Sequence, residues 1–124
     1  MARQIRITAG NVSATATLND SGMADLIWEA CPIESKAKTW GDEIYFAIPV
    51  SLGEEKSRAE VEVGSIAYWP PGKALCVFFG PTPVSQHGEP RAYSPVNVFA
   101  KVTTDPTVLK KVRDGEEVTL ARVE

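Results

Sequence analysis

The sequence predicts a mostly β fold, a closed β-barrel of about eight strands with two short helices that cap its ends. Three observations lead to this prediction. Apolar and polar residues alternate in several short segments, which is typical of strands with one buried face. Glycine- and proline-rich turns separate these segments, and helical spacing of apolar residues occurs only once early and once late. Eight strands can close into a barrel that side chains fill.

The first half of the chain is predicted to form a β-hairpin, a helix and two further strands. Gly10-Asn11 is a pair typical of tight turns and separates two alternating segments. Asn19-Asp20-Ser21-Gly22 supplies capping side chains for a helix over residues 23–30, and Pro32 ends this helix. The strands expected here cover residues 5–9, 12–18, 33–40 and 43–50.

The second half is predicted to form further strands and the late helix. Residues 51–58 are expected to be a polar loop, and residues 80–95 a long loop that contains four prolines. Asp105 is expected to cap the late helix, with Pro106 at its first position and Gly115 after its end. The strands expected here cover residues 59–63, 65–69, 75–79, 96–103 and 117–123.

The two helices are expected to bury apolar side chains where they meet the barrel. These side chains are Met23, Leu26 and Ile27 at one end and Leu109 and Val112 at the other. On this interpretation, truncation of Leu26 to alanine would cost about 2–5 kcal/mol, the usual range for a buried leucine.

Length, charge and cysteine content exclude several classes of protein. The 124 residues fit a single domain over 1–124, and a net charge of −3 without a basic run argues against nucleic acid. No apolar run is long enough to span a membrane, and the first ten residues lack the apolar core of a signal peptide, so a cytoplasmic protein is expected. Cys31 and Cys76 are interpreted as buried free thiols. With one histidine, neither a metal site nor another cofactor is expected, and homo-oligomerisation stays open.

Four aromatic residues between Gly64 and Pro83 could line a binding groove. Tyr68 and Trp69 are adjacent, as are Phe78 and Phe79, so the two side chains of each pair point to opposite faces of a strand. One member of each pair enters the barrel, and the other must be covered or form part of a site. Simple packing of all four rings is the alternative, and the sequence leaves both open.

The segment HGEPRAY contributes the second group of candidate residues. His87, Glu89 and Arg91 offer a titratable base, an acid and an anion-binding guanidinium within five residues, with Tyr93 close by. The alternative is a solvated loop with a local ion pair of little energetic value. The hypothesis therefore places eight residues in one ligand-binding groove: Tyr68, Trp69, Phe78, Phe79, His87, Glu89, Arg91 and Tyr93.

Several strings in the second half of the chain resemble the cyclophilins. These are Gly64-Ser65-Ile66, Cys76-Val77-Phe78-Phe79 followed by Pro81-Thr82-Pro83, and Val98-Phe99-Ala100-Lys101-Val102. The longer string YWPPGKALCVFFGPTP is similar to that of a small bacterial and archaeal cyclophilin-like domain family. The resemblance implies a cyclophilin-type barrel, and members of that small family have no established activity.

The chain departs from the cyclophilins at the residues that catalyse proline isomerisation. Residues 33–40, where cyclophilins carry a catalytic arginine, hold no arginine, and Val77 stands in place of a glutamine. Lys36 or Lys38 does not substitute for a forked guanidinium at the imide. We therefore expect a barrel that is not an ordinary isomerase and that binds a small anionic molecule or a peptide. The alternatives are an isomerase with a rearranged site that uses Arg91, and a partner subunit of an amide-hydrolysing metabolic enzyme.

Overall fold

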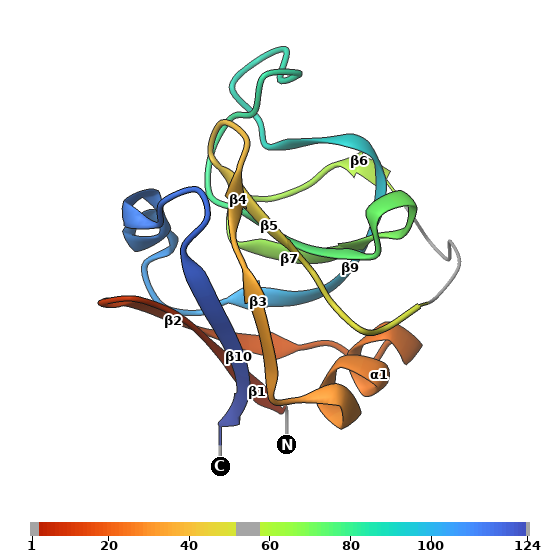
Figure 1. Ribbon diagram of the computed structural model, residues 1–124. Coiled ribbons are helices and arrows are strands. Elements are labelled where there is room, and N and C mark those ends of the chain that lie inside the picture. Colours follow the sequence, from red (N-terminus) through yellow and green to blue (C-terminus); the bar gives the residue numbers. More distant parts are fainter. Residues whose placement is uncertain (1–2, 52–57, 124) are drawn as a thin grey trace.

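The computed structural model describes residues 3–51 and 58–123, and it shows a strongly curved β-sheet wrapped around a hydrophobic core (Figure 1). Helix α1 (Gly22–Ala30) packs at one end of this arrangement, and two short 3₁₀ helices, η1 (Pro70–Gly72) and η2 (Pro106–Lys111), lie in later connections. The strands are β1 (Gln4–Ala9), β2 (Val12–Leu18), β3 (Ile33–Lys36), β4 (Lys38–Thr39), β5 (Glu43–Ala47), β6 (Arg58–Glu60), β7 (Ser65–Trp69), β8 (Ala74–Phe78), β9 (Arg91–Val102) and β10 (Glu117–Val123).

The ten strands form one antiparallel sheet in the order β3-β10-β1-β2-β9-β7-β8-β5-β4, and β6 pairs with β9 beside this path. The mostly β prediction is therefore confirmed, whereas the closed barrel of about eight strands is not. Within residues 3–51 and 58–123, backbone hydrogen bonds do not join β3 to β4 at the two ends of the order. A side-chain hydrogen bond connects β3 to β5, the neighbour of β4 in the order, because the Ser35 hydroxyl donates to the Ala47 carbonyl at 2.7 Å.

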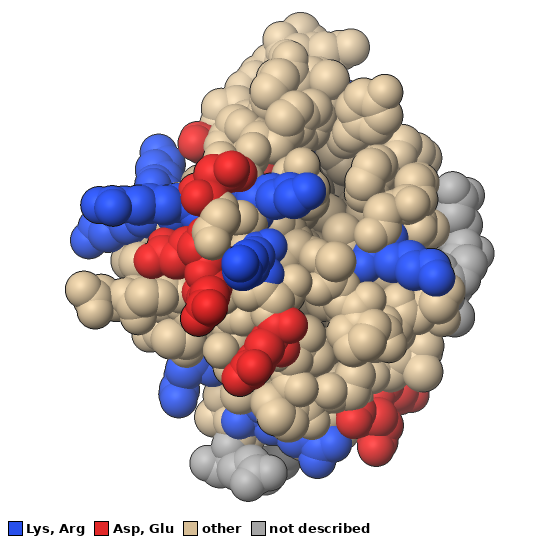
Figure 2. Space-filling view, viewed as in Figure 1, with Lys and Arg blue, Asp and Glu red and all other residues tan. Residues whose placement is uncertain are grey.

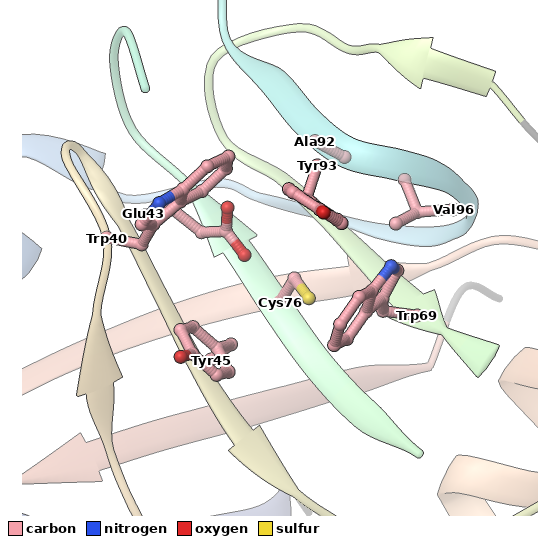
Figure 3. Close-up of a pocket in the computed structure, with 8 residues that line it drawn as sticks. All are labelled: Trp40, Glu43, Tyr45, Trp69, Cys76, Ala92, Tyr93 and Val96. Atoms are coloured by element: carbon pink, nitrogen blue, oxygen red, sulfur yellow. The ribbon is translucent and has the colours of Figure 1, made fainter. Parts of the chain in front are cut away.

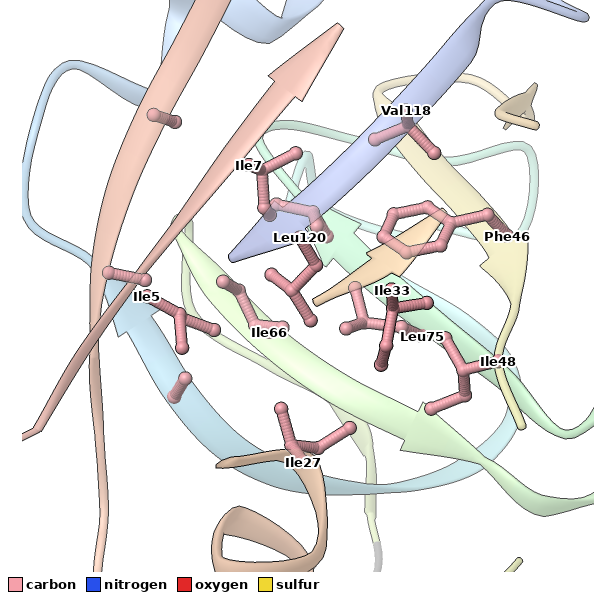
Figure 4. Packing of buried hydrophobic residues seen from close by; sticks show 14 of the residues in the cluster. Ile5, Ile7, Ile27, Ile33, Phe46, Ile48, Ile66, Leu75, Val118 and Leu120 are labelled. Carbon is pink, nitrogen blue, oxygen red and sulfur yellow. The ribbon is translucent and has the colours of Figure 1, made fainter. Parts of the chain in front are cut away.

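Alternation along β5, β7 and β8 sorts side chains between two hydrophobic clusters. The inner cluster lies inside the curved sheet and takes Ile44, Phe46 and Ile66 together with Ile5, Ile7, Tyr68, Leu75, Val77 and Phe79 among others (Figure 4). The alternate positions Ala67, Cys76 and Phe78 face the other side of these strands. They form the outer cluster together with Val61, which follows β6, and with Ala92 and Val96 on β9. The prediction that Phe78 and Phe79 point to opposite faces is confirmed.

Helix α1 forms as predicted but presents a narrower apolar face than expected. The Ser21 side chain caps the helix by accepting from the Ala24 N–H, and Met23 and Ile27 are buried in the inner cluster. The prediction that Leu26 is buried is wrong, because 39% of Leu26 is exposed. Successive residues of an α-helix are about 100° apart, so Leu26 falls outside the stripe centred between Met23 and Ile27.

The late helix is present, but it is a 3₁₀ helix rather than an α-helix. The Asp105 side chain caps it as predicted, accepting from the Thr107 N–H at 3.0 Å, and Pro106 occupies its first turn. Leu109 and Val112 are buried in the inner cluster, which confirms the prediction for both. A segment of six residues is too short for a stable α-helix, and the tighter 3₁₀ form is common in such connections.

The predicted loop over residues 80–95 is shorter in the structure, because β9 already begins at Arg91. The first part of β9 pairs with β6, and its later part pairs with β7 and β2. Pro95 therefore lies inside a strand, where its missing N–H is tolerated at an irregularity of the pairing. Of the predicted polar loop 51–58, residues 52–57 lie outside the described residues. In the part of the chain that is described, no helix is long and apolar enough to cross a membrane.

Candidate functional site

A pocket of about 230 Å³ opens over the outer cluster, on the side of β5, β7 and β8 that faces away from the inner core. The first part of β9 forms the opposite wall (Figure 3). The lining consists of Trp40, Glu43, Tyr45, Trp69, Cys76, Ala92, Tyr93 and Val96. Four of these residues are aromatic, and Glu43 is the acid among them. On the face shown in Figure 2, charged side chains lie mainly over the middle and lower parts, and the upper part is mostly uncharged.

The turn between β4 and β5 fixes Trp40 and Glu43 at the pocket. The Asp42 N–H donates to the Pro81 carbonyl at 2.9 Å, and the Phe79 N–H donates to the Asp42 carbonyl at 2.9 Å. Gly41 has a φ of +61°, and a Cβ there would lie 2.8 Å from the Pro83 ring. Only glycine fits this contact without displacement, so the turn is held against residues 79–83 and its two flanking side chains keep their positions.

Three aromatic rings stand at steep angles to one another around the pocket. The ring centroids of Trp40 and Tyr93 are 6.2 Å apart with an interplanar angle of 73°. Those of Trp69 and Tyr93 are 6.3 Å apart at 90°. The Trp69 indole N–H donates to the Ser94 hydroxyl at 2.6 Å, which fixes the orientation of this ring. These edge-to-face arrangements hold the three rings together beside the pocket without parallel stacking.

An irregularity in β9 brings Tyr93 to the pocket. Arg58 pairs with Val96 and Glu60 with Arg91, so two steps along β6 correspond to five steps along β9. The extra residues form a bulge, and such bulges redirect side chains. Tyr93 is 74% exposed and contacts both tryptophans, which places it at the rim.

Glu43 is a buried carboxylate at the base of the pocket. Its side chain is only 5% exposed, and Oε1 is buried without a hydrogen-bond partner. The Cys76 thiol hydrogen-bonds to the carboxylate, but burial outweighs this contact and raises the pKa of Glu43 to about 7. Burial, the nearby Glu43 charge and the same hydrogen bond hold the pKa of Cys76 well above its usual value, so this thiol stays protonated. Both cysteines are buried and free, as predicted.

The structure separates the four aromatic residues predicted from the stretch 64–83. Trp69 lines the pocket. Tyr68 and Phe79 lie in the inner cluster, and the Tyr68 hydroxyl donates to the Val50 carbonyl at 3.0 Å. Phe78 is fully buried in the outer cluster. For these three residues the simple packing alternative describes their position.

The predicted residues of the 85–93 segment form an ion-paired turn beside the pocket lining. The Glu89 carboxylate accepts from the N–H groups of His87 and Gln86 and from Arg91 Nε, and these contacts lower its pKa to about 2. Arg91 also donates to Glu60 at 3.0 Å, so two carboxylates neutralise it. The residues that line the pocket from this segment are Ala92 and Tyr93, and the His87 side chain is exposed.

Sequence reasoning missed Trp40, Glu43 and Tyr45 as site residues. From the sequence alone, a turn and a strand end account for the Asp42-Glu43 pair, so the pair does not by itself predict a pocket. A signal was nevertheless present in the alternation, because Ile44 and Phe46 belong to the inner face and Glu43 and Tyr45 must share the other. Tyr45 is then opposite Cys76 in the pairing of β5 with β8.

The fold that carries this pocket is a curved antiparallel sheet with helix α1 at one end. The chain matches the Cyclophilin-like family over residues 3–121, and it belongs to this family. Among solved structures it is similar to the solution structure of the hypothetical protein AF2241 from Archaeoglobus fulgidus. The two share 38% sequence identity with a TM-score of 0.84, over 98% of this chain and 95% of the archaeal chain. No curated protein matches the chain.

Proposed function

We propose that this cyclophilin-like chain binds a small molecule, or one side chain of a peptide, in the pocket over the outer cluster, without catalysing proline isomerisation. The observation that carries the proposal is the unpartnered Oε1 of Glu43 beneath aromatic walls. A buried carboxylate without full hydrogen bonding destabilises a fold, and it is rarely present without a reason. A mostly apolar concavity with one oriented polar group is the usual form of a ligand site.

The charge distribution favours a ligand other than the anion expected from the sequence. That expectation depended on Arg91, whose guanidinium is paired with Glu60 and Glu89. An anion in the pocket would instead meet the Glu43 carboxylate, and burial makes such repulsion stronger than it would be in water. The anionic ligand is therefore not part of the proposal.

A non-catalytic role follows from the groups available near the pocket. An isomerase stabilises the twisted imide with a cationic donor such as an arginine, whereas the cationic side chains of residues 33–40 are those of Lys36 and Lys38, which are exposed. Val77, at the place of the cyclophilin glutamine, is buried in the inner cluster and offers no polar group. The Cys76 thiol is held protonated and is a poor nucleophile.

Ligand-observed and protein-observed NMR with a set of neutral, cationic and anionic fragments tests the proposal. Binding in the pocket should shift the indole N–H signals of Trp40 and Trp69 and leave that of Trp28 in place. Trp28 is an internal control, because it is on helix α1 and does not line the pocket. The guanidinium groups of Arg3 and Arg122 lie over its ring. The variant Trp69→Ala should weaken binding, and Trp28→Ala should not. If no fragment at millimolar concentration moves Trp40 or Trp69, the proposed function is wrong.

A further inference from the structure

Resting on the proposed function, we propose that the pocket is a site for a small protonated amine. In this complex an N–H of the ligand reaches Glu43 Oε1, and the positive charge lies against the faces of Trp40, Trp69 and Tyr93 (Figure 3). The three observations that lead to this ligand class are the ring geometry, the unpartnered acceptor and the charge of the lining.

The ring geometry suits a compact cation. The face of an aromatic ring carries the negative part of its quadrupole, and cations bind within about 6 Å of the ring centroid. Tyr93 lies 6.2 Å from Trp40 and 6.3 Å from Trp69, and all three rings line the pocket, so a cation bound there has several aromatic rings as neighbours. Most of the Tyr93 ring is exposed in the free protein, and a bound ligand would cover it.

The unpartnered oxygen specifies a donor on the ligand. An ionised carboxylate can only accept hydrogen bonds, so the partner that Oε1 lacks must carry an N–H or O–H. The Cys76 thiol, which hydrogen-bonds to the Glu43 carboxylate, is a weak donor. A protonated amine supplies a donor and a neutralising charge in one group, which a hydroxyl does not.

The charged and titratable groups around Glu43 leave its charge unmatched. Cys76 on β8, Tyr45 on β5 and Tyr93 on β9 line the pocket with it, and the described lining contains no lysine or arginine. The neighbouring Asp42 is paired with Lys110 Nζ at 3.9 Å. The volume of about 230 Å³ lies below the roughly 300–1,000 Å³ of pockets for drug-sized ligands, which indicates a small amine.

The ionisation of Glu43 distinguishes an amine from a neutral ligand with an acceptor oxygen. Burial raises the pKa of Glu43 to about 7, so both forms are populated near neutrality. A cation favours the ionised form and must bind more tightly as pH rises through this value. A carbonyl ligand would accept a hydrogen bond from the O–H of the neutral acid and would bind more weakly as pH rises over the same range.

The experiment compares cyclopentylamine with cyclopentanol, which have similar shapes and differ in charge. Affinities are measured at pH 8 and pH 5 from the Trp40 and Trp69 indole signals. At pH 8 the amine should bind roughly 10- to 100-fold more tightly than the alcohol, the combined effect of a charged hydrogen bond and cation–π contact. This ratio should fall by roughly tenfold at pH 5, where Glu43 is protonated.

Two variants and one control locate the effect. Glu43→Gln should reduce the amine-to-alcohol ratio to near one, and Tyr93→Leu, a change at an exposed rim residue, should reduce it several-fold without a risk to folding. Glu60→Gln removes a carboxylate outside the lining and should leave the ratio unchanged. An alcohol that binds as tightly as the amine, or a ratio that survives in both pocket variants, overturns the amine site and leaves the proposed function standing. If neither cyclopentylamine, cyclopentanol nor any other fragment binds in the pocket, both the amine site and the proposed function are wrong.

Discussion

The Cys76 thiol on β8 hydrogen-bonds to the Glu43 carboxylate on the neighbouring strand β5. The two residues are diagonal neighbours on one face of the sheet, because Cys76 is directly opposite Tyr45 and Phe78 directly opposite Glu43. The thiol is a weak donor, so it compensates only part of the cost of burying the carboxylate. The pair therefore leaves a buried acid whose pKa is raised to about 7 and whose Oε1 has no hydrogen-bond partner.

The raised pKa of Glu43 predicts a stability that falls between weakly acidic and neutral pH. Burial moves the pKa from its usual value of 4.5 to about 7 in the folded chain. Between these values the folded state binds more protons than the unfolded state. The contribution of Glu43 protonation to the free energy of unfolding is therefore fully present below about pH 4.5 and is lost as pH rises through about 7. At pH 8 the ionised side chain should cost about 3 kcal/mol relative to pH 4.5. Urea unfolding at pH 4.5 and pH 8 measures this difference.

The variant Glu43→Gln isolates that contribution, because glutamine has a similar shape and does not titrate. Its stability at pH 8 should exceed that of the parent chain, and its pH dependence should be flatter. Glu34→Gln, at an exposed position on β3, is the matched control and should reproduce the parental slope. Equal slopes for the parent chain and Glu43→Gln would show that Glu43 does not titrate in this range.

Two adjacent residues of helix α1 should differ sharply in their effect on stability. Ile27 is fully buried in the inner cluster, and Ile27→Ala should cost about 2–5 kcal/mol through lost burial and a cavity. Leu26 is 39% exposed, and Leu26→Ala should cost only about 0.5 kcal/mol, the scale of surface substitutions. Denaturant unfolding of both variants at one pH checks the order. A larger loss for Leu26→Ala would mean that the helix presents a different face to the core.

The Glu89 carboxylate should hold the turn that precedes β9. It accepts hydrogen bonds from the N–H groups of Gln86 and His87 and from Arg91, and these contacts lower its pKa to about 2. In Glu89→Gln, hydrogen exchange of the Gln86 and His87 amides should accelerate, because one carboxylate no longer accepts from both. Glu60→Gln removes only a partner of Arg91 and should leave these two amides protected. Unchanged exchange in Glu89→Gln would contradict the arrangement.

The chain should not accelerate proline isomerisation at the rate of an ordinary cyclophilin. Its pocket contains no arginine in the described lining, and Arg91 is held by two carboxylates. A protease-coupled assay on a proline peptide, with an active cyclophilin as reference, measures the rate. Turnover near that of the reference would contradict the expectation and would favour the rearranged isomerase site.

Local patterns were sufficient to predict most of the individual elements. The capping side chains of Ser21 and Asp105 mark the starts of both helices, because capping depends on residues a few positions apart. Pro106 follows Asp105 at the start of the late helix, and Pro32 follows the end of helix α1. The alternation around Phe78 and Phe79 predicts that one ring enters each face, because successive side chains of a strand point in opposite directions. Capping and strand alternation depend on residues a few positions apart, so both can be predicted from the sequence alone.

Tertiary pairing decided which faces were covered and where the pocket formed. Whether the sheet closes depends on how far its two ends turn toward each other, and here a Ser35 side chain rather than a ladder connects β3 to β5. The irregular pairing of β9 with β6 brings Tyr93 to Trp40 and Trp69, which are far from it in the chain. In the structure, Ile44, Phe46 and Ile48 face the inner core, and Glu43 shares the opposite face with Tyr45. The first part of β9, which is distant in the chain, covers this face and buries Glu43. Both results depend on long-range contacts and not on the local sequence.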